Sequence, residues 1–499
     1  MSRNSTRSAI NMSSDSSTST TDTGPLIARN PGQDNSQLSL MKSVHIMRMV
    51  ESRNYRLDPR TKGKTTLAAP SLSSLNIGTI GHVAHGKSTL VRAITGAKTM
   101  RHKAEIARNM TIKLGHASGE LYRCSSDLCP RPECYKSWGS GQGLQGKSCL
   151  RDGCQGVYSI VRKVSFVDCP GHDILMRTML TGTSAMDAAL LVISADEKCP
   201  QPQTIEHLAA IEALGLKKVI VVQNKIDVVG EEVASKHARQ VRRFLKGTMA
   251  EDAPVVPISA QMNLNIDAVL DKLANIEPPI RDFTSPPRMT IVRSFDVNRP
   301  GSDIAGLKGG VAGGTLTRGV LHLHDEIESR PGLIVRDLDT GKASWRSLYS
   351  RVVSLSAESQ QLDTATPGTL VGVGTLFAPE LCRGDRLVGQ VLGLRDTLPP
   401  VFASITIHFK LLRGLKSKSE DVSRGKINKG EILMLNVGSA AVQGTVSKMK
   451  GHKMVVDLKS LVCTDPGEKV ALSNKVNGHW RLAGWGNVVD GAEAKCDDQ

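Results

Sequence analysis

The chain has 499 residues, of which 39% are hydrophobic and 22% charged, so it is long enough for about three folded domains. Its longest strongly apolar run, Ala188–Ala195, is far shorter than the ~20 residues that a membrane-spanning helix needs, which excludes an integral membrane protein. The formal net charge of +16 favours a polyanionic partner such as nucleic acid, although a merely soluble basic protein fits that charge equally well. Aromatic residues make up only 3% of the chain, which argues against an RNA reader that stacks successive bases on its rings.

Residues 1–72 are expected to form a disordered, Ser/Thr-rich extension. Their first part, residues 1–23, is rich in Ser and Thr and poor in apolar side chains, so it cannot bury enough surface to fold. A transit peptide, which is also rich in Ser and poor in acidic residues, is the weaker alternative. No apolar segment follows the start, so a secretory signal is not expected.

Between residues 73 and 282, buried-strand patterns alternate with helical patterns. The strand patterns are Asn76–Ile80, Lys163–Val167, Ala188–Ser194, Lys218–Gln223 and Pro254–Ile258. The main helical patterns are Lys87–Thr95, Gln203–Leu214 and Glu231–Lys246. This alternation predicts a parallel α/β sheet with right-handed crossovers.

The chain changes character after the proline-containing segment Glu277–Arg281. Beyond it, helical patterns are scarce, and short strand patterns are separated by Gly-rich turns, which is typical of β-barrels. A second proline pair, Pro399–Pro400, divides this region into residues 283–398 and 399–499. The sequence therefore predicts an α/β domain at residues 73–282 followed by two β-barrel domains, II and III.

Residues Gly81–Ser88 match the phosphate-binding pattern G-x-x-x-x-G-K-[ST], and they lie between a strand pattern and a helical pattern, as that loop requires. Backbone N–H groups of such a loop, together with the N-terminus of the following helix, surround the phosphates. We expect Lys87 to contact the β- and γ-phosphates and Ser88 to bind Mg²⁺. The other predicted nucleotide contacts in this segment are His82, Val83, Ala84, His85, Gly86 and Thr89.

Three further residues around the expected phosphate site have predicted roles in Mg²⁺ binding and hydrolysis. Asp168 ends a buried strand, where a carboxylate can hold Mg²⁺, and the N–H of Gly171 can contact the γ-phosphate. Thr111 lies in a loop that can place its hydroxyl on Mg²⁺ when a triphosphate is bound. His172 follows Gly171 directly, so its imidazole can orient the attacking water, although an ordinary surface or core histidine is the alternative. The predicted catalytic residues are therefore His172, Lys87 and Thr111.

The segment after Gln223 predicts the nucleotide base. Asp227 can accept two hydrogen bonds from N1 and N2 of guanine, a donor pair that adenine lacks, so GTP is expected rather than ATP. Lys225 can lie over the base, and Asn224 can tie this loop to the phosphate loop. The remaining predicted contacts, through backbone N–H groups suited to guanine O6, come from Ser259, Ala260 and Gln261.

Five of the ten cysteines lie between Cys124 and Cys154, in an insert of the first domain. Two C-x₄-C pairs bracket this insert, and four thiolates would complete a tetrahedral structural zinc site. The candidate Zn²⁺ ligands are Cys124, Cys129, Cys149 and Cys154, with Cys134 as a spare fifth cysteine. Ordinary free cysteines are the alternative.

Several of these motifs, taken together, resemble the translational GTPases related to elongation factor Tu. Within that group the chain is most similar to the gamma subunits of eukaryotic and archaeal translation initiation factor 2, over roughly residues 73–490. The segments that carry the resemblance are Asn76–Thr89, Arg108–Gly115, Cys129–Tyr135, Val164–Met176, Cys199–Thr204, Ser294–Asn298, Leu307–Gly314 and Gly478–Gly486.

The resemblance implies an α/β P-loop GTPase domain followed by two β-barrel domains, with GTP or GDP and Mg²⁺ as ligands. It also implies a cytoplasmic heterotrimer with alpha and beta subunits that carries methionyl initiator tRNA to the small ribosomal subunit. By the same resemblance, a separate activating factor promotes hydrolysis, and an exchange factor replaces the nucleotide. The aminoacylated end of the tRNA would sit between the first two domains, and the alpha subunit on the second.

The chain also departs from this family at Arg177, Thr181, Asp196 and Lys198. Two alternative functions stay open, and these departures point only to the second of them. One is an elongation-type, selenocysteine-specific GTPase, against which Ala84 and the cysteine-rich insert speak. The other is a divergent paralogue that binds nucleotide only as a scaffold for partner subunits.

Overall fold

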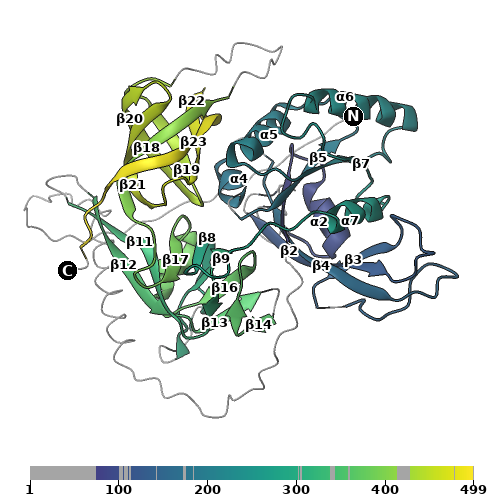
Figure 1. The fold of residues 1–499 in the computed structure, drawn as a ribbon, viewed down its shortest axis with the longest axis horizontal. Helices are drawn as coiled ribbons and strands as arrows, with labels where there is room; N and C mark the ends of the chain where they lie inside the picture. Colours follow the sequence, from purple (N-terminus) through teal and green to yellow (C-terminus); the bar gives the residue numbers. More distant parts are fainter. Residues whose placement is uncertain are drawn as a thin grey trace, which may run out of the picture. The chain divides into compact units, whose positions relative to one another are not determined.

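The computed structural model describes residues 75–497, with gaps at 100–113 (apart from 105 and 111), 142, 172–175, 184, 300–305 (apart from 301 and 303), 338–342, 358–359, 413–426 and 477. The expected N-terminal extension, residues 1–72, lies outside this described part. Along the chain, an α/β sheet is followed by an antiparallel sheet and then by a closed β-barrel (Figure 1). No helix in the described ranges is both long and apolar enough to cross a membrane.

The first domain is built on a seven-stranded sheet. Its strands, in the order in which they lie across the sheet, are β3 (Tyr135–Gly139), β2 (Gly115–Cys124), β4 (Tyr158–Asp168), β1 (Leu75–Ile80), β5 (Ala188–Ser194), β6 (Val219–Asn224) and β7 (Val255–Pro257). Its described helices are α2 (Lys87–Thr95), α4 (Met176–Thr183), α5 (Pro202–Leu214), α6 (Glu231–Leu245) and α7 (Ile266–Ala274).

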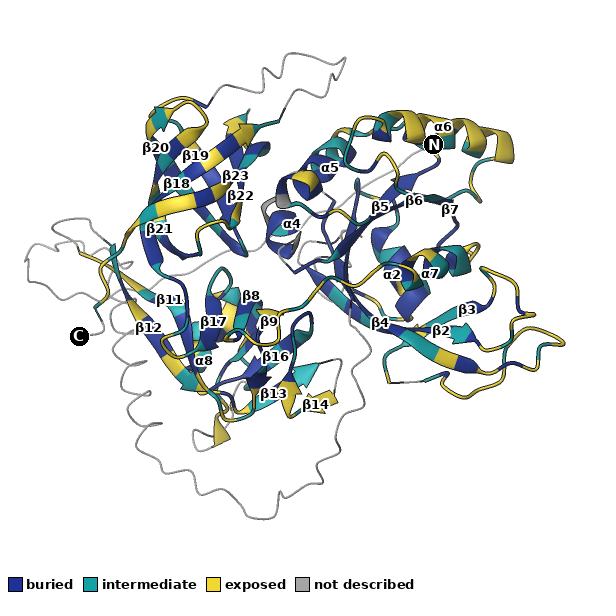
Figure 2. Cartoon of the chain, in the orientation of Figure 1, coloured by how far each residue is buried: buried dark blue, intermediate teal, exposed yellow. Residues whose placement is uncertain are grey.

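Two apolar cores cover the two faces of this sheet, as Figure 2 shows by burial. Strand β5 divides its side chains between them, because successive residues of a strand point to opposite faces. Leu190 and Val192 pack with α2 and α7, whereas Leu191 and Ile193 pack with α4, α5 and α6. The continuous apolar run of β5 is therefore buried on both sides, as in other sheets covered by helices.

The five strands expected from the sequence run parallel to one another, but the sheet contains two further strands that do not. Strands β1, β4, β5, β6 and β7 are parallel, but β2 pairs antiparallel with β4, and β3 pairs antiparallel with β2. The chain between β2 and β4 is the cysteine-rich insert rather than a crossover helix. Without a crossover the chain turns back on itself, and the neighbouring strands run in opposite directions.

The second domain is an eight-stranded antiparallel sheet. Its order is β12 (Ala343–Arg351), β11 (Glu326–Arg336), β17 (Val391–Leu394), β8 (Arg288–Phe295), β9 (Val311–Arg318), β16 (Leu370–Gly374), β13 (Ser354–Ala357) and β14 (Gln360–Leu362). The remaining elements are a two-stranded sheet of β10 (Leu321–His322) and β15 (Thr364–Ala365), the short helix α8 (Pro379–Cys382) and the 3₁₀ turn Arg383–Asp385.

The third domain is a closed barrel. Its order is β18 (Val401–Leu411), β21 (Lys453–Cys463), β20 (Ala440–Lys450), β19 (Ile432–Val437), β22 (Lys469–Val476) and β23 (His479–Glu493). Along β18, Ile405, Ile407 and Phe409 alternate with more exposed residues and point into the barrel core. Because the sheet closes on itself, no strand edge is left unpaired.

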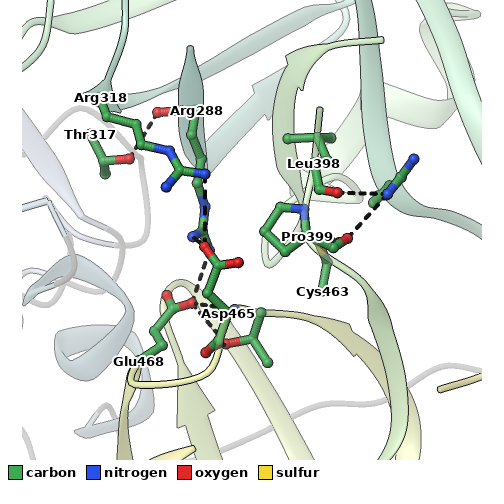
Figure 3. A network of polar contacts seen from close by, with 10 residues as sticks. Arg288, Thr317, Arg318, Leu398, Pro399, Cys463, Asp465 and Glu468 are labelled. Carbon is green, nitrogen blue, oxygen red and sulfur yellow. Dashed lines mark hydrogen bonds and ion pairs between the residues drawn. The ribbon is translucent and has the colours of Figure 1, made fainter. Parts of the chain in front are cut away.

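An ion-pair network links β8 to the turn between β21 and β22 (Figure 3). The guanidinium of Arg288 donates to Asp465 at 2.6 Å and to Glu468 at 2.9 Å. Burial of Arg288 lowers its pKa, but the two carboxylates outweigh this effect and raise it. Nearby, Cys463 donates to the carbonyl oxygen of Pro399, in the segment that joins β17 to β18. Charged and polar side chains therefore hold the second sheet against the barrel.

Candidate functional site

The phosphate loop Gly81–Ser88 connects β1 to α2, and its backbone requires glycine at two places. Gly81 and Gly86 have φ angles of +136° and +90°, which other residues rarely adopt. A Cβ on Gly81 would lie 2.2 Å from the carbonyl oxygen of Val192, and a Cβ on Gly86 would lie 2.2 Å from Nδ2 of Asn224. The loop therefore packs directly against β5 and against the end of β6.

Lys87 extends back into this loop. Its ammonium donates to the carbonyl oxygens of Gly81, at 2.9 Å, and His82, at 2.6 Å. Burial lowers the pKa of Lys87 to about 8, and the carboxylate of Asp168 opposes that shift. A phosphate bound in the loop would supply further negative charge to this buried ammonium, as the predicted contact to the β- and γ-phosphates requires.

Asp168, at the end of β4, is fully buried among hydroxyl groups. It accepts hydrogen bonds from Thr79 at 2.8 Å, from Ser88 at 2.6 Å and from Thr99 at 2.6 Å. The hydroxyl of Ser88 also lies 3.1 Å from that of Thr111. The three predicted Mg²⁺ ligands thus share one cluster of oxygen atoms, one of them from a carboxylate, which is the donor set that Mg²⁺ prefers.

Gly171 packs tightly against the phosphate loop. A Cβ there would lie 2.4 Å from Nζ of Lys87 and 2.9 Å from the carbonyl oxygen of Gly81. His172, the next residue, lies outside the described part of the chain. Its role in orienting water therefore stays a prediction.

His85 anchors the middle of the phosphate loop. Its side chain is fully buried, its Nδ1 lies 3.0 Å from the carbonyl oxygen of Val192, and its Nε2 lies 3.2 Å from Glu197. Burial lowers the pKa of His85, against the raising effect of these two partners. The other predicted loop contacts are half-buried or exposed, and they are His82, Val83, Ala84 and Thr89.

Asn224 joins the phosphate loop to two segments of the base site. Its Nδ2 donates to the carbonyl oxygen of His85 at 2.9 Å, and its Oδ1 accepts from the N–H of Ala260 at 3.0 Å. Lys225 and Asp227 follow in the same turn, and Asp227 is exposed. Ser259 is fully buried, and its hydroxyl accepts from the N–H of Met262 at 3.2 Å, which shapes the turn that includes exposed Gln261.

Sequence reasoning missed His207, a fully buried residue of α5. The N–H of Gly81 donates to its Nδ1 at 3.0 Å, so a side chain of α5 binds the first amide of the phosphate loop. Burial, with the nearby charge of Lys87, lowers the pKa of His207 to about 3, so the ring is a neutral acceptor at physiological pH. A lone histidine in a helical pattern gives no signal of this contact.

The pKa of His207 has a consequence for stability. In the unfolded chain its pKa should be about 6.5, so from about pH 6.5 down to pH 3 the unfolded state binds a proton that the folded state does not. Lowering the pH through that window should therefore reduce the free energy of unfolding, by about 1 kcal/mol between pH 6.5 and 5.5. In the H207Q variant the glutamine side chain can still accept the hydrogen bond from Gly81 but does not titrate. The pH-dependent loss of stability that His207 causes should therefore be absent.

Urea unfolding can measure this difference if Trp138 is the only tryptophan left, since it lies in β3 of the same domain. The matched control is H322Q, because His322 is exposed on β10 of the second domain. An equal loss of stability in H207Q and in the parent chain would show that His207 is not the titrating group.

The cysteine-rich insert brings four sulfur atoms together. The Sγ atoms of Cys124, Cys129, Cys149 and Cys154 all lie within 4.8 Å of one another. Tetrahedral zinc with Zn–S bonds of about 2.3 Å would place its sulfurs about 3.8 Å apart, and the Cys124–Cys154 distance is 3.6 Å. This group of thiols could therefore bind zinc, and buried Cys134 is not part of it.

The surroundings of these thiols favour thiolate at one position. Burial raises the pKa of Cys124 to about 12. Burial also raises that of Cys149, but hydrogen bonds from the Arg151 backbone and from Tyr158 outweigh this and lower it to about 7. Gly156 leaves the space for the cluster, since a Cβ there would lie 2.3 Å from Sγ of Cys124.

Comparisons with known proteins agree with this geometry. The family model described as Elongation factor Tu GTP binding domain matches residues 72–279, and that described as Initiation factor eIF2 gamma, C terminal, matches residues 403–488. The chain is 51% identical over 428 residues to eukaryotic translation initiation factor 2 subunit gamma of Schizosaccharomyces pombe, which covers 85% of this chain and 95% of that protein. It belongs to the family of translation initiation factor 2 gamma subunits.

Another gamma-family relative is eukaryotic translation initiation factor 2 subunit 3 of Drosophila melanogaster, 50% identical over 84% of this chain and 89% of that protein. The predicted family, the translation initiation function and the GTPase activity are thereby confirmed, and a GTPase domain of this kind binds GTP and GDP.

Solved structures of translation elongation factors share the fold. SelB from Methanococcus maripaludis, in complex with the GTP analogue GppNHp, aligns with a TM-score of 0.59 and 21% identity over 84% of this chain and 79% of that one. A bacterial EF-Sec aligns with a TM-score of 0.59 and 20% identity over 83% and 58% of the two chains. The predicted fold class, a P-loop GTPase domain followed by β-barrel domains, is confirmed. At such identities the likeness does not extend to function, so the elongation-type alternative is not favoured over the gamma family.

Proposed function

We propose that this chain is the nucleotide-binding subunit of a heterotrimeric factor that carries methionyl initiator tRNA to the small ribosomal subunit. The observation that supports this most strongly is the identity of 51% along nearly the whole length of a curated gamma subunit. In this proposal alpha and beta subunits complete the factor, which works in the cytoplasm. The domain boundaries that we propose are residues 73–282, 283–398 and 399–499, after the extension 1–72.

The phosphate and metal side of the proposed site combines residues from three segments. Lys87 binds the β- and γ-phosphates, while Ser88, Thr111 and Asp168 hold Mg²⁺. The support is their shared oxygen cluster, in which Asp168 lies 2.6 Å from Ser88 and Ser88 lies 3.1 Å from Thr111. When bound, Mg²⁺ neutralises charge on the phosphates. His172 orients the attacking water, and hydrolysis depends on a separate activating factor.

The base side of the proposed site selects guanine. Asp227 accepts from N1 and N2 of the base, and Lys225 covers one face of the ring. Asn224 connects these residues to the phosphate loop through its bond to His85. An exchange factor replaces GDP with GTP, and the GTP-bound state binds the tRNA.

The insert is proposed to hold one structural zinc ion. The support is the donor set of four cysteine sulfurs within 4.8 Å of one another, which fits the closed tetrahedral sites of structural zinc. A metal there would fix the insert beside β2 and β4, the strands that lead to Asp168.

Filter binding of the reconstituted heterotrimer to methionyl initiator and elongator tRNAs tests the proposed function. We expect the affinity for initiator tRNA to be at least about 10-fold higher with the GTP analogue GppNHp than with GDP. The elongator tRNA should bind weakly in both nucleotide states. Equal or absent initiator binding in the two nucleotide states would contradict the carrier function. The scaffold alternative, or a different RNA substrate, would then replace it.

A further inference from the structure

Two acidic residues after β5 contact both loops of the proposed nucleotide site. Oε2 of Glu197 lies 3.2 Å from Nε2 of His85 in the phosphate loop. Oδ2 of Asp196 lies 3.1 Å from Nζ of Lys225 in the loop after β6. The turn after β5 therefore bridges the part of the site that faces the phosphates and the part that faces the base. Glu197 therefore holds the phosphate loop through His85, whereas Asp196 contacts a residue of the proposed base site.

Asp196 is anchored more firmly than its lysine partner. The hydroxyl of buried Ser194 donates to Oδ1 of Asp196. Ser194 itself pairs with Asn224 in the register of β5 and β6, and the N–H of Ala195 donates to the carbonyl oxygen of Asn224 at 2.8 Å. The carboxylate is thus fixed to the sheet through two neighbouring strands, and the ion pair carries that constraint to Lys225.

The backbone of Lys225 is also held, but its side chain has freedom of its own. Its φ angle is +63°, in the left-handed region, and its carbonyl oxygen accepts from the N–H of Val228 at 3.2 Å. About 30% of the lysine side chain is exposed. A lysine has several rotatable bonds, so without a partner for the ammonium its stem would sample many positions. An ion pair at its tip restricts these positions before any base is bound.

We infer that Asp196 is a positioning residue for the base: it holds the ammonium of Lys225 so that the methylene stem lies across one face of guanine. This inference rests on the proposed function, in which Lys225 covers the base. Asp196 acts through Lys225 and need not touch the nucleotide. The ion pair thereby sets how long the nucleotide stays bound.

Asp196 carries the charge that this role requires. Burial raises the pKa of its carboxyl, but hydrogen bonds from Ser194 and Lys225, with the lysine's charge, outweigh burial and hold the pKa below its usual range. The carboxylate is ionised at neutral pH. Because both partners are partly exposed, the pair contributes modestly, and salt screens it.

Release of fluorescent GDP from the full chain tests this inference. In D196A we expect GDP to dissociate about three- to fivefold faster than from the parent chain. That change corresponds to the free energy that a partly exposed ion pair usually contributes. D196N should fall between the two, because its amide oxygen can still accept from Lys225. The difference should shrink at 1 M salt, where charges are screened within about 3 Å. A general loss of structure would not depend on salt in this way.

A double-mutant comparison decides whether Asp196 acts through Lys225. In a K225M background, D196A should no longer change the release rate, since the ion pair is already absent. An undiminished effect of D196A in that background, or no effect of D196A in the parent chain, would overturn the inference. E326A is the matched control, because Glu326 forms an exposed ion pair with Arg351 in the second domain.

The D227N variant distinguishes a failure of the proposed role of Asp196 from a failure of the proposed guanine site. Weakened GDP binding in D227N together with unchanged release in D196A would overturn only the role of Asp196. Unchanged GDP binding in D227N would instead overturn the guanine site on which that role depends.

Discussion

The D227N variant is expected to bind GTP about 100-fold more weakly than the parent chain. Asp227 accepts two hydrogen bonds from guanine in the proposed site, and each bond to a charged group contributes about 1.5–3 kcal/mol. Because Asp227 is exposed, we take the lower end of that range, about 3 kcal/mol for the pair, which corresponds to roughly 100-fold in affinity. The loss should be equally large for GDP, since both nucleotides carry the same base.

The same substitution should change which base is preferred. Xanthine has a carbonyl oxygen at C2 where guanine has an amino group, so the amide of an asparagine can donate to it. D227N is therefore expected to bind XTP more tightly than GTP. Competition against a fluorescent guanine nucleotide, with XTP and GTP as competitors, measures both affinities. D252N is the control, because Asp252 is an exposed carboxylate of the same domain in another loop; a D227N protein that still preferred GTP would rule out the proposed contact.

The buried strands of the first domain could be predicted from sequence because their apolar runs are continuous. Strand β5 has the predicted bounds, Ala188–Ser194, and helix α2 has the predicted bounds Lys87–Thr95. Strands β2 and β3 were missed, because their residues are mixed in polarity and β3 lies inside the cysteine-rich insert. A mixed pattern of this kind is typical of an edge hairpin as well as of a loop.

The candidate site divides in the same way. Its motifs are local, so Lys87, Ser88 and Asp168 could be proposed from the motifs and the strand patterns before them, and the structure brings their side chains close together. The contacts of His207 and Asp196 could not be found in this way. Each joins segments that are distant in sequence, through a hydrogen bond from Gly81 or an ion pair with Lys225. Only the order and register of the strands bring such partners into contact.

Removal of the proposed zinc is expected to lower the stability of the first domain strongly. The parent chain should contain one equivalent of zinc, and C129S should contain none, because three thiolates do not complete a closed tetrahedral site. Losing about 3 kcal/mol of metal-dependent stability would lower the melting temperature of the first domain by about 10 °C. Zinc content by elemental analysis and the melting temperature by calorimetry provide the two measurements.

C134A distinguishes a metal site from a cluster of buried thiols. Cys134 is as buried as Cys124, at 2% exposure each, but it is not one of the four grouped sulfurs. C134A should keep one equivalent of zinc and lose only the small stability of a trimmed core side chain, about 1 kcal/mol. Equal melting temperatures for C129S and C134A, with no zinc in the parent chain, would contradict the metal site. Acidification gives a further check: protons compete with the metal for the four sulfurs, so zinc should dissociate as the pH is lowered.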